Sequence, residues 1–449
     1  MGCLQELDSK QIQKRIKIRL RRKDAFERVY MDVSKKVFLL ALSLVLISCD
    51  DGPQAEGPSP FIKTSVPGCE GQRRKGEYLV FWKNGKVSVE KYVNDKSFVE
   101  DFVEKHKDEV ITSEPHYQIQ VEASSKISQR DWGGYLNWGV DVIGAADLWS
   151  KATNAEEVIV AVIDSGVDVG HPELQGSFAI NNDETVNGVD DDGNGLIDDR
   201  MGYDFVVGSG EVVDYTGHGT HVSGVIGAQH GVGKVTGVAP NVKILPLAFI
   251  SNNGGGSVEA AVNAIRYAAS RKVKVINASW GGSTCSSLLK NEIAALAKQN
   301  ILFVTAAGNS NNNLSQIPEY PAAFILNNMI TVGASAYEEL TNSEVTAGFS
   351  NFGELVDLVA PGANIASTYP PEFDSDGLLD GVVVLEGTSM ATPYVAASAA
   401  LLWSIKPAAS FVEIKQALLA GAKPGPFRVK TRGSLFLPQA LAELESMLP

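Results

Sequence analysis

Beyond residue 130 the sequence alternates between short, continuous apolar runs and stretches whose apolar residues recur at helical spacing. The apolar runs cover residues 158–164, 243–249, 273–279, 301–307 and 329–335, with helical stretches at 257–270 and 287–299 among them. Continuous apolar strands that alternate with helices are typical of a parallel sheet covered on both faces. We therefore predict a three-layer α/β fold with a mainly parallel central sheet for residues 130–449, and functional residues at the carboxyl ends of its strands.

A smaller α+β unit is predicted at about residues 75–122. Two alternating apolar runs in EYLVFWKNGKVSVEKYV are joined by Asn84-Gly85, a dipeptide that favours a tight hairpin. A stretch with helical spacing and a third strand, ITSEPHYQIQVEA, follow; the spacing residues are Phe98, Val99, Phe102 and Val103.

The N-terminal segment has the composition of a targeting signal. Lys35 and Lys36 precede an apolar run of 11 residues, Val37–Ile47. A membrane-spanning helix needs about 20 apolar residues, so residues 31–48 fit an export signal better. Residues 49–74, rich in Pro, Gly and polar residues, fit a flexible tether. Residues 1–30 are either an over-long reading of a gene that starts at Met31 or a basic cytoplasmic extension.

The charge balance argues against a nucleic-acid partner. The chain holds 39 Lys and Arg against 53 Asp and Glu, and 11 of the former but 5 of the latter lie in residues 1–48. From Cys49 onward the net charge is therefore −20. Such a surface repels phosphate backbones.

Four cysteines are present: Cys3, Cys49, Cys69 and Cys285. In an oxidising compartment Cys69 and Cys285 could form a disulfide. The sequence does not place their Cα atoms within bridging distance, so the pairing stays open.

Three polar residues in glycine-rich surroundings are candidates for nucleophilic catalysis, which needs a nucleophile, a base and a group that orients the base. Asp164 ends a buried strand, His218 lies in GHGTHVSG (217–224), and Ser389 lies in GTSMATPYVAA (387–397). Each has a structural alternative: an Asp that caps a strand, a metal pair with His221, and a helix N-cap Ser.

An acidic loop between the first two candidates predicts a calcium site. NGVDDDGNGLIDDRMGYDF (187–205) places oxygen ligands at alternate positions before a glycine, as calcium loops do. Position 12 of that pattern is Met201, so the loop is not an EF-hand. The expected ligands of a structural Ca²⁺ are Asp190, Asp192, Asn194, Asp198 and Asp199; a solvated acidic turn is the alternative.

Three segments together resemble the subtilase family of serine proteases: DSGVDVGHPEL at Asp164, GHGTHVSG at His218 and GTSMATP at Ser389. Their order along the chain, Asp then His then Ser, is that of subtilisin. The resemblance covers residues 130–449 and implies a subtilisin-like fold. It also implies that Asp164 orients His218, that His218 is the base and that Ser389 attacks the peptide carbonyl. Asn309 in TAAGNS would then donate to the oxyanion, and His221 would be structural.

The resemblance extends to substrate binding and processing. In subtilases two backbone segments bind an extended peptide, and the matching residues are Gly255 and Ser279-Trp280-Gly281. The unit at 75–122 resembles a subtilase pro-domain, although it is shorter and lacks one strand–helix step. Leu46-Ile47-Ser48-Cys49 resembles the lipoprotein box of bacteria, which implies that Cys49 carries the lipid.

These observations predict an enzyme: a serine endopeptidase of broad specificity that processes itself. We expect protein or peptide substrates, its own pro-segment and the membrane as partners, no nucleic acid, and a monomeric state. The expected location is the cell envelope, lipid-anchored at the periplasmic or extracellular face, or else secretion. Two alternatives remain, a catalytically silent binding protein of the same fold and a calcium-dependent adhesion module.

Overall fold

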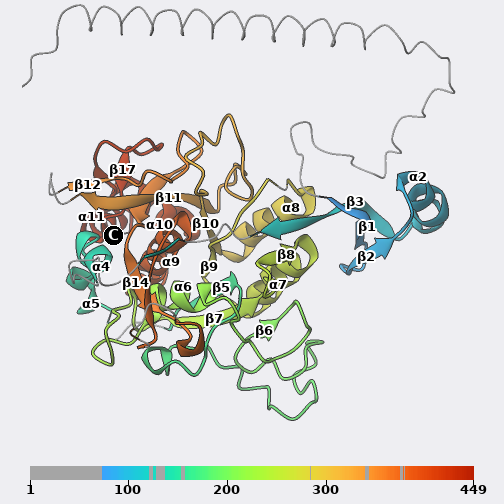
Figure 1. Ribbon diagram of the computed structural model, residues 1–449, viewed down its shortest axis with the longest axis horizontal. Helices are drawn as coiled ribbons and strands as arrows, with labels where there is room; N and C mark the ends of the chain where they lie inside the picture. The colour runs from blue at the N-terminus through green and yellow to red at the C-terminus, as the bar shows by residue number, and fades with distance from the viewer. Residues whose placement is uncertain are drawn as a thin grey trace, which may run out of the picture. The chain divides into compact units, whose positions relative to one another are not determined.

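A computed structural model describes residues 73–120, 125–127, 137–152, 157–283, 285–338, 343–374, 378 and 380–448 (Figure 1). The predicted extension, export signal and lipid-carrying Cys49, together with Cys3, Cys69 and most of the tether, lie outside these residues. Among the helices of the described part, none has the length and apolarity needed to cross a membrane.

The central sheet of the described residues has ten strands. All neighbours from β17 to β6 pair in parallel, while β16 and β12 are antiparallel to their partners. The predicted mainly parallel sheet is thus confirmed, and each of the five predicted runs contains a strand. In spatial order the strands are β16 (Lys423–Pro424), β17 (Gly433–Ser434), β13 (Leu358–Pro361), β11 (Met329–Glu338), β10 (Leu302–Ala306), β9 (Val275–Ala278), β5 (Ile159–Asp164), β7 (Lys243–Ala248) and β6 (Tyr203–Asp204), with β12 (Ser343–Thr346) beside β11.

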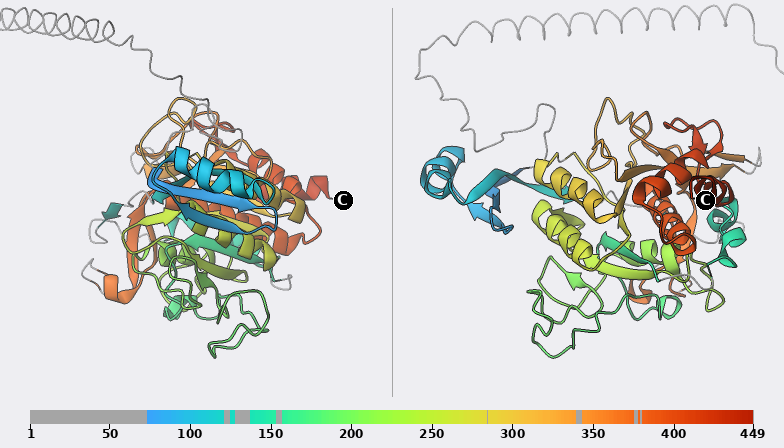
Figure 2. Two further views of the ribbon diagram at one scale, coloured as in Figure 1. Left: turned by 90° about the vertical axis from the view of Figure 1, so that its right-hand side faces the viewer. Right: turned by 180° about the vertical axis from the view of Figure 1, so that it is seen from behind.

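Helices cover both faces of this sheet, which makes the three layers (Figure 2). Successive residues of a strand point to opposite faces, so Val160 and Val162 belong to one apolar cluster and Ala161 and Ile163 to the other. The first cluster contains α6 and α9, and the second contains α7 and α8. The helices are α4 (Trp138–Val142), α5 (Ala146–Trp149), α6 (His218–Gly227), α9 (Thr388–Ile405), α10 (Phe411–Ala420) and α11 (Leu437–Met447) on the first face, and α7 (Val258–Ser270) and α8 (Ser287–Ala295) on the second.

Shorter elements complete the large unit, which comprises the described residues from 125 to 448. A three-stranded sheet runs in the order β14 (Ile365–Thr368), β15 (Val382–Glu386) and β4 (Ser125–Ile127). Single 3₁₀ turns are η3 (Pro172–Leu174), η4 (Leu296–Gln299) and η5 (Pro371–Phe373).

The small unit consists of a hairpin, a helical stretch and a long strand. β1 (Arg73–Trp82) and β2 (Val87–Lys91) form the hairpin, whose turn contains Gly85 at φ 86°. The helical stretch comprises α2 (Asp95–Phe98), a π-helical turn η1 (Val99–Val103) and α3 (Glu104–His106). β3 (Val110–Gln120) pairs with β1 and then with β8 (Gly255–Ser257) of the large unit, toward which it extends in Figure 1.

Candidate active site

Three of the predicted site residues lie at or just beyond the carboxyl ends of three neighbouring strands. Asp164 is the last residue of β5, Ser279 follows β9, and Asn309 lies three residues beyond β10. Because β10, β9 and β5 are adjacent and parallel, these residues share the carboxyl edge of the sheet. The fold therefore brings together residues that are far apart in the sequence.

Asp164 and His218 form a buried hydrogen-bonded pair. Nδ1 of His218 lies 2.7 Å from Oδ1 of Asp164, which is fully buried. A carboxylate only accepts, so Nδ1 carries the hydrogen, and in the neutral ring Nε2 keeps its lone pair. Burial disfavours the imidazolium, but the charge and hydrogen bond of Asp164 and the charge of Asp214 outweigh burial and raise the pKa of His218. The pair can thus take up a proton at Nε2.

The residue before His218 has to be a glycine. Gly217 has φ 80°, and a Cβ there would lie 2.1 Å from the ring of Tyr369. Gly217 directly precedes α6, so this turn places His218 in the first turn of the helix.

His221, on the same helix, is tied to the backbone instead of to the pair. Its Nε2 donates to the carbonyl oxygens of Ile365 at 3.0 Å and Val383 at 3.1 Å. Burial, and then the nearby charge of His218, lowers the pKa of His221 to about 3, so its ring is neutral at ordinary pH. These bonds join α6 to β14 and β15, which is a structural role.

Ser389 lies in the first turn of α9, which packs against α6. Its Oγ donates to the carbonyl oxygen of Ser279 at 3.0 Å, while Oγ of Ser279 donates to the carbonyl oxygen of Ser389 at 2.8 Å. Nε2 of His218 is buried and makes no hydrogen bond within the described residues. The structure thus joins Asp164 to His218 and Ser389 to Ser279, and within the described residues it has no hydrogen bond between Ser389 and His218.

Asn309 is fixed by the residue that precedes Ser389. Its Oδ1 accepts hydrogen bonds from the backbone N–H of Thr388 at 2.8 Å and from the Thr388 hydroxyl at 3.0 Å. Since a backbone N–H can only donate, Oδ1 is the accepting end of this amide and Nδ2 the donating end. The side chain is half-buried beside the start of α9.

Of the two predicted peptide-binding segments, the one at Gly255 is occupied by the chain itself. β3 pairs antiparallel with β8, with Gln120 opposite Gly255 and Gln118 opposite Ser257. A Cβ on Gly255 would lie 2.6 Å from Nε2 of Gln118, so a larger residue there would displace the end of that side chain.

The second segment has a side chain in the core. Trp280 is 1% exposed, donates from Nε1 to the carbonyl oxygen of Ile163 at 2.8 Å, and lies beside Phe249 and Phe303. The indole therefore cannot contact a substrate. Ser279 is fully buried as well, so Gly281 is the one partly exposed residue of the three.

A buried glutamate fastens the small unit to the large one. The carboxylate of Glu114, in β3, accepts hydrogen bonds from the hydroxyl of Ser286 and from the N–H and hydroxyl of Ser287, the last two at 3.0 and 2.7 Å. These groups stand at the start of α8, where a carboxylate also meets the positive end of the helix dipole. Nη1 of Arg266, in α7, adds a bond to the carbonyl oxygen of Gly85 in the hairpin turn.

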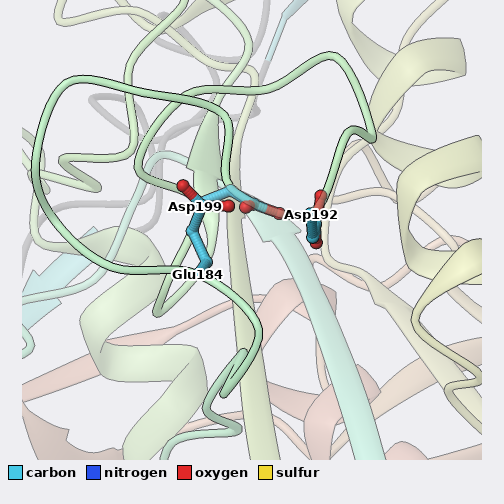
Figure 3. Close-up of side chains that lie close together, drawn as sticks. All are labelled: Glu184, Asp192 and Asp199. Carbon is cyan, nitrogen blue, oxygen red and sulfur yellow. The ribbon is translucent and has the colours of Figure 1, made fainter.

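The acidic loop gathers three carboxylates, of which one was not predicted. Oxygens of Glu184, Asp192 and Asp199 lie within 4.8 Å of one another, and the side chains point toward a common centre (Figure 3). Two oxygens bound to one Ca²⁺ are at most about 5 Å apart, so this donor set fits that ion. Glu184 and Asp199 are fully buried, and Arg271 lies 3.8 Å from Asp199. Glu184 was missed because it lies outside the alternating pattern.

Two of the five predicted ligands, Asp190 and Asp198, lie outside this cluster and accept hydrogen bonds from the loop backbone. Asp190 accepts from the N–H groups of Gly193, Asn194 and Gly195, and Asp198 accepts from those of Asn187 and Gly188. Of the remaining three, Asp192 and Asp199 belong to the cluster. Nδ2 of Asn194 donates to both of these at 3.0 Å.

Cys285 is disulfide-bonded. The other three cysteines precede residue 73 and lie outside the described residues, so the pairing with Cys69 stays a prediction.

A buried Asp–His pair, and a serine in the first turn of a helix packed against the helix of that histidine, are the residue types from which serine hydrolases are built. The family model "Subtilase family" of S8 peptidases matches residues 155–436. The chain belongs to the subtilase family, and it is a subtilisin-like serine endopeptidase.

Several relatives are similar to this chain. The major intracellular serine protease of Bacillus subtilis is 36% identical over 270 residues, which cover 59% of this chain and 74% of that protein. A thermophilic serine proteinase of Bacillus sp. strain AK1 is 31% identical over 83% of this chain and 80% of its own length. Subtilisin-like protease 1 of Plasmodium berghei is 32% identical, with 62% of this chain and 48% of that protein covered.

A solved structure confirms the fold. It is that of fervidolysin from Fervidobacterium pennivorans, described as a keratinolytic enzyme related to subtilisin. The TM-score is 0.67 at 24% identity, over 86% of this chain and 65% of that one.

Proposed function

We propose that this protein cleaves peptide bonds through Asp164, His218 and Ser389, and that it first cleaves itself. The observation that carries the proposal is the buried hydrogen bond of 2.7 Å between Asp164 and His218, which orients Nε2 as the base. His218 takes the proton of the Ser389 hydroxyl, Ser389 attacks the carbonyl carbon, and His218 returns the proton to the leaving amine. Water then hydrolyses the acyl-enzyme by the reverse use of the same groups.

The oxyanion of this step needs donors that are already in place. Thr388 holds the amide of Asn309 with its oxygen toward α9, so Nδ2 is the end that can donate to the developing charge. The backbone N–H of Ser389, in the first turn of α9, is the second donor. Both come from elements fixed by packing, so they require little reorganisation.

Self-cleavage is supported by how the chain is held on both sides of residues 121–124. On one side Gln120 pairs with Gly255, the segment expected to bind substrate. On the other side Ser125 pairs with Glu386, three residues before Ser389. We therefore propose that one of the peptide bonds between Gln120 and Ser125 is cut, and that residues 75–122 act as the pro-domain.

Backbone pairing of the kind seen between β3 and β8 reads few side chains, which supports broad specificity. We also propose that Glu184, Asp192 and Asp199 hold a structural Ca²⁺. The export signal and Cys49 support attachment to the cell envelope by a lipid.

The test is labelling by a fluorophosphonate, which reacts with an activated serine. The full chain from Met31, made with calcium, should label, whereas Ser389→Ala and His218→Ala should not. His230→Ala is the matched control, because His230 bonds to the carbonyl oxygen of Gly237 and not to the pair, and it should label fully. Absence of label in the wild type would favour the silent binding protein.

A further inference from the structure

A buried carboxylate outside the proposed catalytic residues connects the segment that carries Asp164 with the segment that carries His218. Asp214 lies four residues before His218 and is 2% exposed. It belongs to no strand or helix, and the resemblance to subtilases stated above assigns it no role.

Oδ1 of Asp214 fixes the turn before His218. It accepts from the N–H of Thr216 at 3.0 Å and from the N–H of Gly217 at 2.9 Å. The hydroxyl of Thr216 in turn accepts from the N–H of His218 at 3.2 Å. The backbone on the N-terminal side of the imidazole is therefore held by one oxygen.

The same oxygen reaches the residue that follows Asp164. The hydroxyl of Ser165 donates to Oδ1 of Asp214 at 2.9 Å, and it accepts from the N–H of Gly219 at 3.0 Å. Besides the Asp164–His218 hydrogen bond, β5 and the start of α6 are thus connected through the carboxylate of Asp214 and the hydroxyl of Ser165.

Oδ2 of Asp214 fixes the first turn of α6. It accepts from the N–H and the hydroxyl of Thr220, at 2.8 and 2.7 Å. Both oxygens of this buried carboxylate are therefore satisfied, and they hold residues on both sides of His218.

We propose that Asp214 is a positioning residue: it sets His218 relative to Asp164 and supplies a second fixed negative charge to the imidazolium that forms during the reaction. This inference rests on the proposed function. If Asp214 only capped α6, it would make the same hydrogen bonds, but loss of its charge would leave the pKa of His218 unchanged.

Two acids near α6 stabilise the charged form of His218. Asp164 of β5 and Asp214 are the acids whose charges raise the pKa of His218, against its burial. His221 on the same helix is neutral at ordinary pH. The remaining groups near α6 include His171 and Glu173 at η3, Lys243 of β7 and Tyr394 of α9. Asp168 bonds through its N–H to Thr220, and Tyr369 bonds through its hydroxyl to the carbonyl oxygen of Thr216.

The experiment is the pH profile of kcat/KM for Asp214→Asn in the full, self-processed chain. Fluorophosphonate titration of active sites corrects for misfolded protein. The charge stabilises the imidazolium, so its removal lowers the pKa at which activity is lost on acidification, by about 0.5–1.5 pH units. The plateau should fall about tenfold or more, because the geometry loosens.

Two further variants separate charge from geometry. Asp204→Asn changes a buried carboxylate that bonds only to nearby backbone N–H groups, and it should leave the pH profile unchanged. Ser165→Ala removes the bridge but keeps the charge, so it should lower the plateau and leave the pKa within about 0.2 units.

Either of two results overturns the inference: an Asp214→Asn profile that matches the wild type in pKa, or a Ser165→Ala plateau equal to the wild type. The second decides alone if Asp214→Asn does not fold. If the wild type itself takes no label, the proposed function has failed instead.

Discussion

The attachment of the small unit through Glu114 gives a quantitative prediction. Glu114→Gln replaces one carboxylate oxygen by an NH₂ group, which cannot accept from the hydroxyl of Ser286 or the N–H and hydroxyl of Ser287. A hydrogen bond to a charged group contributes about 1.5–3 kcal/mol, and a charge at a helix N-terminus about 0.3–1 kcal/mol. Loss of one such bond and of the helix interaction should weaken the binding of the small unit by about 2–4 kcal/mol.

The corresponding change in affinity is roughly 30- to 700-fold, since about 1.4 kcal/mol is tenfold. The assay dilutes the self-processed enzyme, with reductant present to open any disulfide, and measures the active fraction on a peptide substrate. The concentration at which half the enzyme is active should rise by that factor in Glu114→Gln.

The control is Glu100→Gln, in the same small unit. The side chain of Glu100 is 62% exposed and its ion pair with Lys96 lies at the surface, so the midpoint should not move. A shift of less than about threefold for Glu114→Gln would show that the Glu114 carboxylate does not hold the small unit, because it is below what one charged hydrogen bond contributes.

Three other predictions follow from the site. Asn309→Ala should lower kcat by about 10²–10³ with little change in KM; an unchanged kcat would mean that its Nδ2 does not meet the oxyanion. Glu184→Gln should weaken calcium-dependent stabilisation: at a calcium concentration 100 times Kd the wild type gains about 2.7 kcal/mol, and equal melting temperatures with and without chelator would contradict the site. If Cys285 pairs with Cys69, the two products of self-cleavage should migrate together on a non-reducing gel and separate with reductant, unlike Cys69→Ser.

The layers and strands of the large unit were predictable because continuous apolar runs alternate there with stretches whose apolar residues recur at helical spacing. All five apolar runs contain strands, because a strand buried on both faces of a sheet carries apolar residues at nearly every position. The helical stretch of the small unit was predicted as one helix, but the structure inserts a π-helical turn at Val99–Val103. No residue type in that stretch forces such a turn, so spacing alone could not reveal it.

The site was predictable where unusual backbone geometry requires a particular residue type, as the positive φ of Gly217 requires a glycine. Contacts between distant segments require no particular residue spacing, so the sequence pattern does not reveal them. Glu184 joins Asp192 and Asp199 only through the path of the loop, and Asp214 meets Ser165 only because β5 and α6 are neighbours. For the same reason the pattern could not show that Asp190 and Asp198 bond to the backbone of their own loop.

Whether Ser389 cuts its own chain is tested by the intact mass of the chain made from Met31 with calcium, compared with that of Ser389→Ala. We expect the wild type to yield a catalytic fragment whose first residue lies between Val121 and Ser125, while Ser389→Ala stays uncut. A wild type that remains full length, or a Ser389→Ala protein that purifies cut at the same bond, would show that Ser389 does not make this cut.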